Sequence, residues 1–121
     1  TGEEVTLATA EYVSLDESVG CLSTSYFPEA LKTAVLPRLG RVKIIGNYRC
    51  AGHEYRLLAS GGAQFCAYSK LMPWDHLAGA LITTEAGGHV AYTARDREGT
   101  LIAAASAESW QAVRDQLFHE A

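Results

Sequence analysis

Long apolar segments and basic residues are both scarce in this chain of 121 residues, and each scarcity excludes a class of protein. No apolar run approaches the roughly 20 residues that a membrane-spanning helix needs. No charged segment followed by an apolar one opens the chain, as it would in a secretion signal. Basic residues number 10 against 14 acidic ones, so the net charge is −4 and a nucleic-acid-binding surface is not expected. We therefore predict a cytoplasmic protein with no membrane or nucleic-acid partner.

Cysteine is also rare, and the three that occur do not form a metal-binding pattern. Cys21, Cys50 and Cys66 are an odd number, and their spacing fits no set of metal ligands. We predict that they are buried free thiols. The sequence also lacks a Ser-His-Asp arrangement, a Walker phosphate loop and the glycine fingerprint of dinucleotide-binding proteins.

The residues that are present indicate a single folded domain over residues 1–121. Hydrophobic residues make up 48% of the chain, which is enough for a core of its own. The chain begins at Thr1 without an initiator methionine, and we therefore expect the sequence to be a fragment.

Stretches with strand character alternate with stretches of helical periodicity along the chain. Strands are predicted over residues 5–10, 19–25, 41–46, 63–69, 89–93 and 101–105. Helices are predicted from residue 28 to 35, 50 to 60, 74 to 86, and onward from a cap at residue 106. This alternation predicts an α/β domain in which helices pack on a layered, mixed β-sheet.

The stretch from residue 73 to residue 88 has the most complete set of helix signals. Pro73 suits a first turn, and the carboxylate of Asp75 would face the positive end of the helix dipole. Gly87 and Gly88 supply a left-handed stop. Several larger residues recur at helical spacing and predict one broad buried face. They are Trp74, Leu77, Ala78, Leu81 and Ile82.

This stretch resembles the C-terminal motif of the inositol monophosphatase family. The resemblance rests on Trp74-Asp75, on Ala78-Gly79-Ala80 and on Glu85-Ala86-Gly87-Gly88, while Leu77 departs from a position that usually holds a small residue. It implies the fold of the C-terminal half of these magnesium-dependent phosphomonoesterases. It also implies that Asp75 binds a catalytic Mg²⁺, with water activated by the metal as the nucleophile.

The other metal ligands of that family come from an N-terminal domain, and their Asp-Pro-x-Asp-Gly-Thr loop does not occur in this sequence. We therefore expect the chain alone to be inactive, and to need the N-terminal domain as a partner. Without that domain, apolar surface would be exposed, and such surface tends to be covered by another chain. A homo-oligomer is the resulting expectation.

A second stretch, residues 49–54, resembles the family's substrate-contacting helix start. Cys50 and Ala51 fill the places of a small hydroxyl residue and an alanine, but Arg49 stands where the family prefers glycine. Tyr68 lies where some members use a glutamate to hold a substrate hydroxyl. The resemblance thus implies that Cys50, Ala51 and Tyr68 line a site for inositol phosphate or a related sugar phosphate.

Other interpretations of the same residues remain open at this point. From helix rules alone, Asp75 is an ordinary acid of a first turn, and residues 50–54 are a helix start packed under the sheet. The chain as a whole would then be a stand-alone, non-catalytic α/β domain used for binding or assembly.

Overall fold

The computed structural model describes residues 7–24, 27–47, 51–69, 73–93 and 100–119; for residue 51 and residues 73–76 it describes the backbone alone. One five-stranded sheet has the strand order β2-β1-β3-β5-β4. Its strands are β1 (Val19–Leu22), β2 (Ile44–Gly46), β3 (Phe65–Tyr68), β4 (His89–Tyr92) and β5 (Leu101–Ala104). The α-helices are α1 (Glu29–Val35), α2 (Ala51–Ala59), α3 (Pro73–Glu85) and α4 (Ala107–Val113). Short 3₁₀ segments cover Leu15–Glu17 and Leu36–Arg41, and a π-helical segment, Arg114–Phe118, extends α4.

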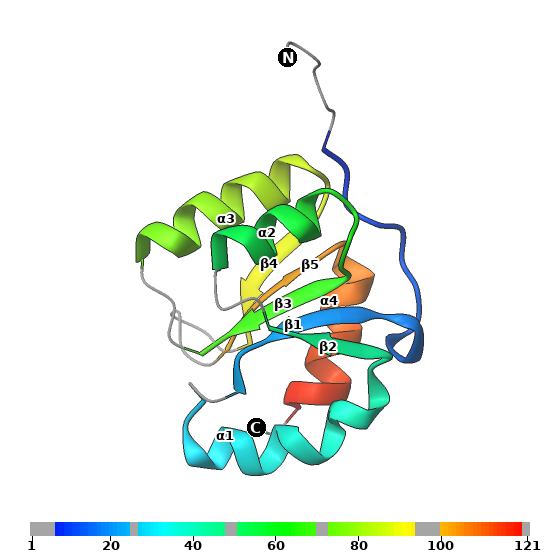
Figure 1. The fold of residues 1–121 in the computed structure, drawn as a ribbon, viewed down its shortest axis with the longest axis vertical. Helices are drawn as coiled ribbons and strands as arrows, with labels where there is room; N and C mark the ends of the chain where they lie inside the picture. The colour runs from blue at the N-terminus through cyan, green and yellow to red at the C-terminus, as the bar shows by residue number, and fades with distance from the viewer. Residues whose placement is uncertain (1–6, 25–26, 48–50, 70–72, 94–99, 120–121) are drawn as a thin grey trace.

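The sheet is mixed, as the alternation of strands and helices predicted. Strand β1 pairs in parallel with both β2 and β3. Strand β5 pairs antiparallel with β3 on one side and with β4 on the other. Figure 1 shows α2 and α3 side by side over one face of this sheet, with α1 and α4 over the other. The layered α/β architecture is thereby confirmed.

Each face of the sheet has its own apolar core, because successive residues of a strand point to opposite sides. Phe65 and Ala67 lie in the core that α1 and α4 cover, whereas Cys66 lies in the core that α2 covers. The largest side chains that α2 contributes are Tyr55 and Leu58, with exposed fractions of 1% and 0%.

The helix ends follow the signals in the sequence. After α3, Gly87 has a positive φ of 106°, and the N–H of Gly88 donates to the carbonyl of Thr83 at 2.8 Å. This is the bond of a Schellman turn, which satisfies a carbonyl that the helix leaves open. At the start of α4, Ser106 Oγ accepts from the N–H of Ser109 at 3.1 Å, as an N-cap serine does.

The prediction of a strand over residues 5–10 is wrong for the residues that are described, 7–10, which have no regular structure. This segment crosses the ends of the helices instead of joining the sheet. The N–H of Thr9 donates to the carbonyl of Ala86, just after α3, at 3.1 Å. At Thr9, this segment therefore bonds to the residue that follows α3 and not to a strand of the sheet.

The predicted buried face of α3 is wrong for Leu77, Ala78 and Leu81, whereas Ile82 is half-buried and the side chain of Trp74 lies outside the described residues. Leu77 and Leu81 have exposed fractions of 64% and 60%, and Ala78 is exposed too. The residues that face inward are Gly79 and Thr83, and the reason is the neighbouring helix. A Cβ atom at Gly79 would overlap the ring of Tyr55 from α2. Only a small residue fits there, so the leucines lie on the opposite side of the 3.6-residue turn.

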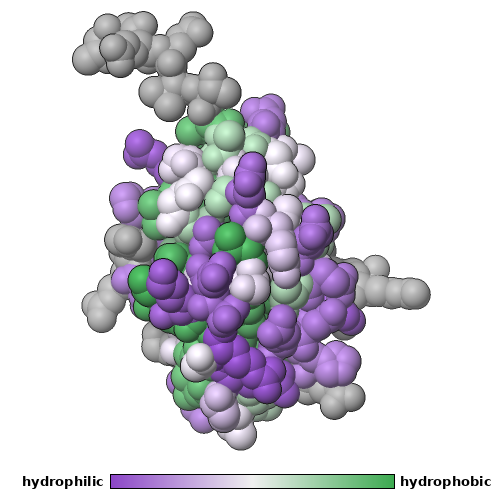
Figure 2. All heavy atoms as spheres, turned by 90° about the vertical axis from the view of Figure 1, so that its right-hand side faces the viewer, coloured by the Kyte–Doolittle hydropathy of each residue, from purple (hydrophilic) through white to green (hydrophobic). Residues whose placement is uncertain are grey.

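Polar and apolar residues are mixed on another side of the molecule. Figure 2 shows the side of the molecule that lies to the right in Figure 1, and hydrophilic residues interrupt the hydrophobic ones over it. Within the described ranges, no helix is long and apolar enough to cross a membrane.

Candidate functional site

The candidate site lies where three parallel strands end and two helices begin. Strands β1, β2 and β3 run in the same direction, so Leu22, Gly46 and Tyr68 end at one edge of the sheet. Helices α2 and α3 both begin at that edge, as Figure 1 shows. The carboxyl edge of parallel strands is where α/β proteins commonly bind ligands. Free N–H groups at two helix starts add positive partial charge there.

Two polar side chains join across this edge. Ser23, directly after β1, donates from Oγ to Oδ1 of Asn47, directly after β2, at 2.8 Å. Both residues follow parallel strands that pair in register, so the sheet itself places them together. Neither residue of this pair was among the predicted site residues. The signal that could have found it is a polar residue at the end of each of two predicted strands.

Asp75 lies in the first turn of α3, as the resemblance implied, and α3 begins at Pro73. The position of its carboxylate lies outside the described residues. Magnesium prefers several oxygen ligands in octahedral geometry. Among the side chains that are described, no group of three or more His, Cys, Asp or Glu residues could hold a metal ion. These residues alone therefore do not fit a complete magnesium site.

The second predicted stretch is only partly described. Cys50 lies outside the described residues, and Ala51 begins α2 with its backbone alone placed. Two residues further on, His53 is exposed while Glu54 is buried. They point in opposite directions, so they do not act together as a pair of ligands.

Tyr68 is half-buried, and its hydroxyl group faces an acid inside the domain. Tyr68 Oη donates to Oε1 of Glu54 at 2.8 Å, and the ring of Tyr55 lies 5.5 Å from that of Tyr68 between centroids. Burial, the neighbouring Cys66 and Glu54 raise the pKa of Tyr68 well above its ordinary value. The hydroxyl group therefore keeps its proton and donates it in the hydrogen bond to Glu54. The lone pairs of the hydroxyl oxygen can accept a hydrogen bond from another group.

Two thiols lie on neighbouring strands of the same region, Cys21 on β1 and Cys66 on β3. Cys21 and Cys66 are partners in the parallel register, and both are buried and free, as predicted. Their hydrogen bond lowers the pKa of Cys21. The same bond, together with burial, raises the pKa of the Cys66 thiol. The Cys66 thiol donates to the backbone carbonyl of Glu54 at 3.6 Å.

The burial of Glu54 and its bond with Tyr68 were not predicted from the sequence. The exposed fraction of Glu54 is 1%, which is unusual for a carboxyl group and requires a polar partner. The helical spacing of Ala51, Glu54 and Leu58 places Glu54 on the inner face of α2, and this pattern could have revealed it.

The geometry defines a layered α/β domain with a candidate ligand site at the carboxyl edge of its parallel strands. A model of the inositol monophosphatase family matches residues 9–120. The chain belongs to this family. No curated protein matches the chain closely enough to count as a relative.

Solved structures show the same fold. The extragenic suppressor protein suhB from Bartonella henselae is similar, with a TM-score of 0.79 and 21% identity over 93% of this chain and 47% of its own. The IMPase of Thermotoga maritima has a TM-score of 0.71 and 23% identity, over 96% of this chain and 44% of its own. An inositol monophosphatase from Zymomonas mobilis has a TM-score of 0.75 and 17% identity, over 91% and 46%. The chain thus spans a little under half the length of the solved structures that it matches.

Proposed function

We propose that this chain is the C-terminal domain of a magnesium-dependent phosphomonoesterase that hydrolyses inositol phosphate or a related sugar phosphate. One observation carries the proposal: α3 begins at the carboxyl edge of the parallel strands, with Asp75 in its first turn, in a member of the inositol monophosphatase family. Asp75 would supply one ligand of the metal. When bound, magnesium supplies an activated water molecule and stabilises charge on the leaving oxygen.

The rest of the proposed site comes from the helix starts and from β3. Cys50 and Ala51 would meet the substrate at the start of α2, where backbone N–H groups favour an oxyanion. Tyr68 would present its oxygen as an acceptor to a substrate hydroxyl group, because its own proton is held by Glu54. A glutamate at this place would offer two acceptor oxygens to a substrate hydroxyl group, whereas Tyr68 offers one. This difference favours a sugar phosphate related to inositol phosphate over inositol phosphate itself as the substrate.

The chain alone should be inactive, because the remaining acidic ligands would come from the N-terminal domain. The test supplies the missing part as the half of the Bartonella henselae chain that this chain does not match, called here the complementing half. It is added in trans or joined to this chain. Magnesium-dependent phosphate release is measured on a panel of inositol and sugar phosphates.

We expect release only when both parts are present, and loss of release with Asp75→Asn. Asparagine is also accepted near a helix start, so this variant should keep the fold. Turnover by the 121-residue chain alone would contradict the half-site. Undiminished turnover in the variant would remove Asp75 from the mechanism.

A second candidate is a stand-alone, non-catalytic α/β domain used in binding or assembly. The observation that favours it is the pair of closed cores, one on each face of the sheet, since a domain with its own cores can fold without another. Failure of every combination in the assay above, with both parts folded and bound to each other, would favour this candidate.

A further inference from the structure

The core that α2 covers holds two thiols at the separation that a disulfide requires. Cys21 and Cys66 are register partners on neighbouring strands, and both side chains lie in this core, on the same face of the sheet. Neighbouring strands lie about 4.8 Å apart, and the Cα atoms of a disulfide lie about 4.4 to 6.8 Å apart. Since the two thiols also share a hydrogen bond, a bond between their sulfur atoms needs no change of strand register.

The two thiols are not equivalent as nucleophiles. The hydrogen bond with Cys66 lowers the pKa of Cys21, whereas the same bond and burial raise the pKa of Cys66. The thiolate is the form of cysteine that attacks an oxidant. Cys21 should therefore react first and Cys66 second.

We propose that Cys21 and Cys66 form a redox-active pair, which a hydroperoxide converts to a disulfide between β1 and β3. The Cys21 thiolate attacks one peroxide oxygen, the O–O bond breaks, and Cys21 becomes a sulfenic acid. Cys66 then attacks the sulfur of Cys21, forms the S–S bond and displaces hydroxide. The two thiols give up two electrons and two protons in all, and hydrogen peroxide becomes two water molecules.

Tyr68 is the residue that connects this pair to the surface. It packs against the core that holds both thiols and is half-buried, whereas the exposed fractions of Cys21 and Cys66 are 1% and 0%. Its hydroxyl group is held by Glu54 at 2.8 Å. Hydrogen peroxide, which is little larger than water, can reach the sulfur atoms when the ring of Tyr68 moves aside.

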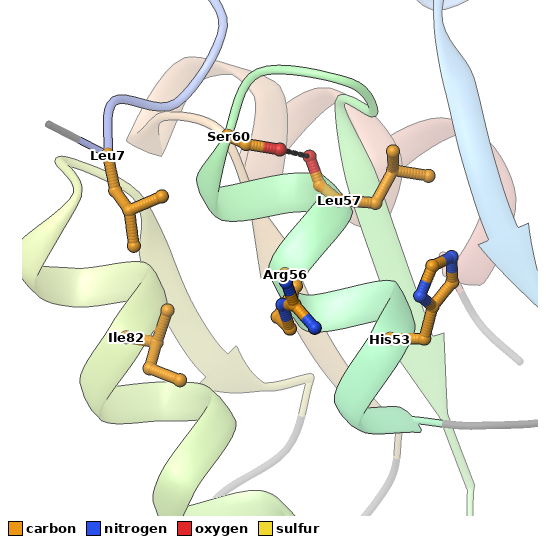
Figure 3. A pocket seen from close by; sticks show the side chains of 6 residues that line it. All are labelled: Leu7, His53, Arg56, Leu57, Ser60 and Ile82. Atoms are coloured by element: carbon orange, nitrogen blue, oxygen red, sulfur yellow. Dashed lines mark hydrogen bonds between the residues drawn. The ribbon is translucent and has the colours of Figure 1, made fainter. Parts of the chain in front are cut away.

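The pocket between α2 and α3 lies on the far side of α2 from the thiols. It has a volume of about 570 Å³ and is lined by Leu7, His53, Arg56, Leu57, Ser60 and Ile82. Figure 3 shows Arg56 at its centre, between Ile82 of α3 and His53 of α2. Tyr55 and Leu58 fill the buried side of α2, next to the thiols. The route past Tyr68 therefore avoids the packed side of this helix.

Oxidation would act on the start of α2. The Cys66 thiol donates to the backbone carbonyl of Glu54 at 3.6 Å, and Glu54 lies in the first turn of the helix. A disulfide removes this S–H, and with it one contact that holds the helix start over β3. Ala51 at this helix start is part of the proposed substrate site, so this consequence rests on the proposed function, whereas formation of the disulfide does not.

The test treats the folded 121-residue chain with hydrogen peroxide in a Cys50→Ala background, in which the two thiols of the pair are the ones that remain. Free thiols are counted after denaturation, and mass spectrometry follows the intact chain. We expect both thiols to disappear together, with the loss of two hydrogen atoms and no added oxygen. Dithiothreitol should restore both thiols.

Two serine variants in the same background test the order of attack. Cys66→Ser keeps a hydroxyl group beside Cys21 but cannot form the disulfide, so a sulfenic acid that a cyclic dione traps should accumulate at Cys21. Cys21→Ser leaves the Cys66 thiol, which should react at least about tenfold more slowly, as one unit of pKa implies. Alanine replaces serine in a variant that circular dichroism shows to be unfolded.

The route past Tyr68 has a matched control. Tyr68→Ala should speed up formation of the disulfide, whereas Tyr12→Ala, at a tyrosine with an exposed fraction of 44%, should leave the rate unchanged. If the alanine variant unfolds, Tyr68→Phe replaces it, because it loses the bond to Glu54 and keeps the ring. Equal rates at the two tyrosine positions would overturn this route.

Three results would overturn the redox pair itself. One is survival of both thiols in the folded chain under peroxide that oxidises the urea-unfolded chain. Another is a disulfide through Cys50 when the unchanged chain is oxidised and its peptides are mapped. The third is a Cys66 thiol that reacts as fast as Cys21. Because no metal or phosphate ester takes part, failure of the earlier assay leaves these results unaffected.

Discussion

Helices α3 and α4 cover opposite faces of the same sheet, yet their outer sides differ. The outer side of α4 carries polar residues, and Gln111 donates to Asp115 across one turn at 2.9 Å. The outer side of α3 carries Leu77 and Leu81, each more than half exposed. Both helices bury one side against the sheet, so the buried sides do not explain the difference. The difference lies in the sides turned away from the sheet, where α3 exposes two leucines and α4 exposes polar residues.

The largest effect is expected where α3 meets α2. Gly79→Leu would drive a side chain into the ring of Tyr55, and should lower the free energy of unfolding by about 2 to 3 kcal/mol. Urea unfolding measures the change. Ala78→Leu, at the exposed neighbouring position, is the control and should change stability by less than about 0.5 kcal/mol. Equal effects of the two substitutions would show that the inner face of α3 is not Gly79 and Thr83.

The next effect concerns the start of α4. Ser106→Ala removes the oxygen that accepts from the N–H of Ser109, and should cost about 1 kcal/mol. Ser60→Ala, which removes an exposed hydroxyl group at the end of α2, is the matched control. Thermal unfolding of both variants measures the difference. A cost no larger than that of Ser60→Ala would mean that this cap does not hold α4 in place.

The third prediction uses the raised pKa of Tyr68. The folded protein keeps the phenolic proton at a pH where the unfolded chain, with an ordinary pKa of about 10, releases it. Stability from the Tyr68–Glu54 bond is therefore complete below about pH 10 and falls above it, with a slope approaching about 1.4 kcal/mol per pH unit for one proton. Tyr68→Phe should reduce that slope by one proton in urea unfolding between about pH 8 and about pH 11.

The control for this slope is Tyr12→Phe, at a tyrosine with an exposed fraction of 44%. This variant should retain the slope of the unchanged chain. If Tyr68→Phe also retained it, the proton of Tyr68 would not be held more firmly in the folded state than in the unfolded one.

The smallest effect is expected at the exposed Leu77 and Leu81, and it separates the two sides of α3 most sharply. The double variant Leu77→Lys, Leu81→Lys should change the free energy of unfolding of the isolated chain by no more than about 0.5 kcal/mol per site. The side chains are already in water, so little buried apolar area is lost. A loss comparable to that of Gly79→Leu would place the leucines in the core and end the contrast between the helices.

Much of the fold was predictable because its signals are local. Ser106 as a cap and Gly87 and Gly88 as a stop act within a turn or two, and the apolar run from Leu101 to Ala104 is a buried strand by composition alone. The side of α3 that faces inward was not predictable in this way. Gly79 and Thr83 have the same spacing as Leu77 and Leu81, and only the ring of Tyr55, from another helix, decides between the two pairs.

In the candidate site, too, the features set by local sequence were predictable and those set by contacts between distant segments were not. The position of Asp75 in a first turn follows from the residues around it, as does the place of Tyr68 at the end of β3. The partner of Tyr68 does not, because Glu54 meets it only after α2 has folded over the sheet. Likewise, the register that brings Cys21 opposite Cys66 is set by strand pairing, which no local pattern fixes.

The most direct test of the half-site account is metal binding by the two parts, apart and together. Mn²⁺, a spectroscopic substitute for magnesium, is titrated into the 121-residue chain, the complementing half and their complex, and electron paramagnetic resonance measures the bound ion. We predict weak binding to the chain alone, tighter binding to the complex than to either part, and loss of that gain with Asp75→Asn. The account would be contradicted by tight binding to the chain alone, or by a gain in the complex that survives Asp75→Asn.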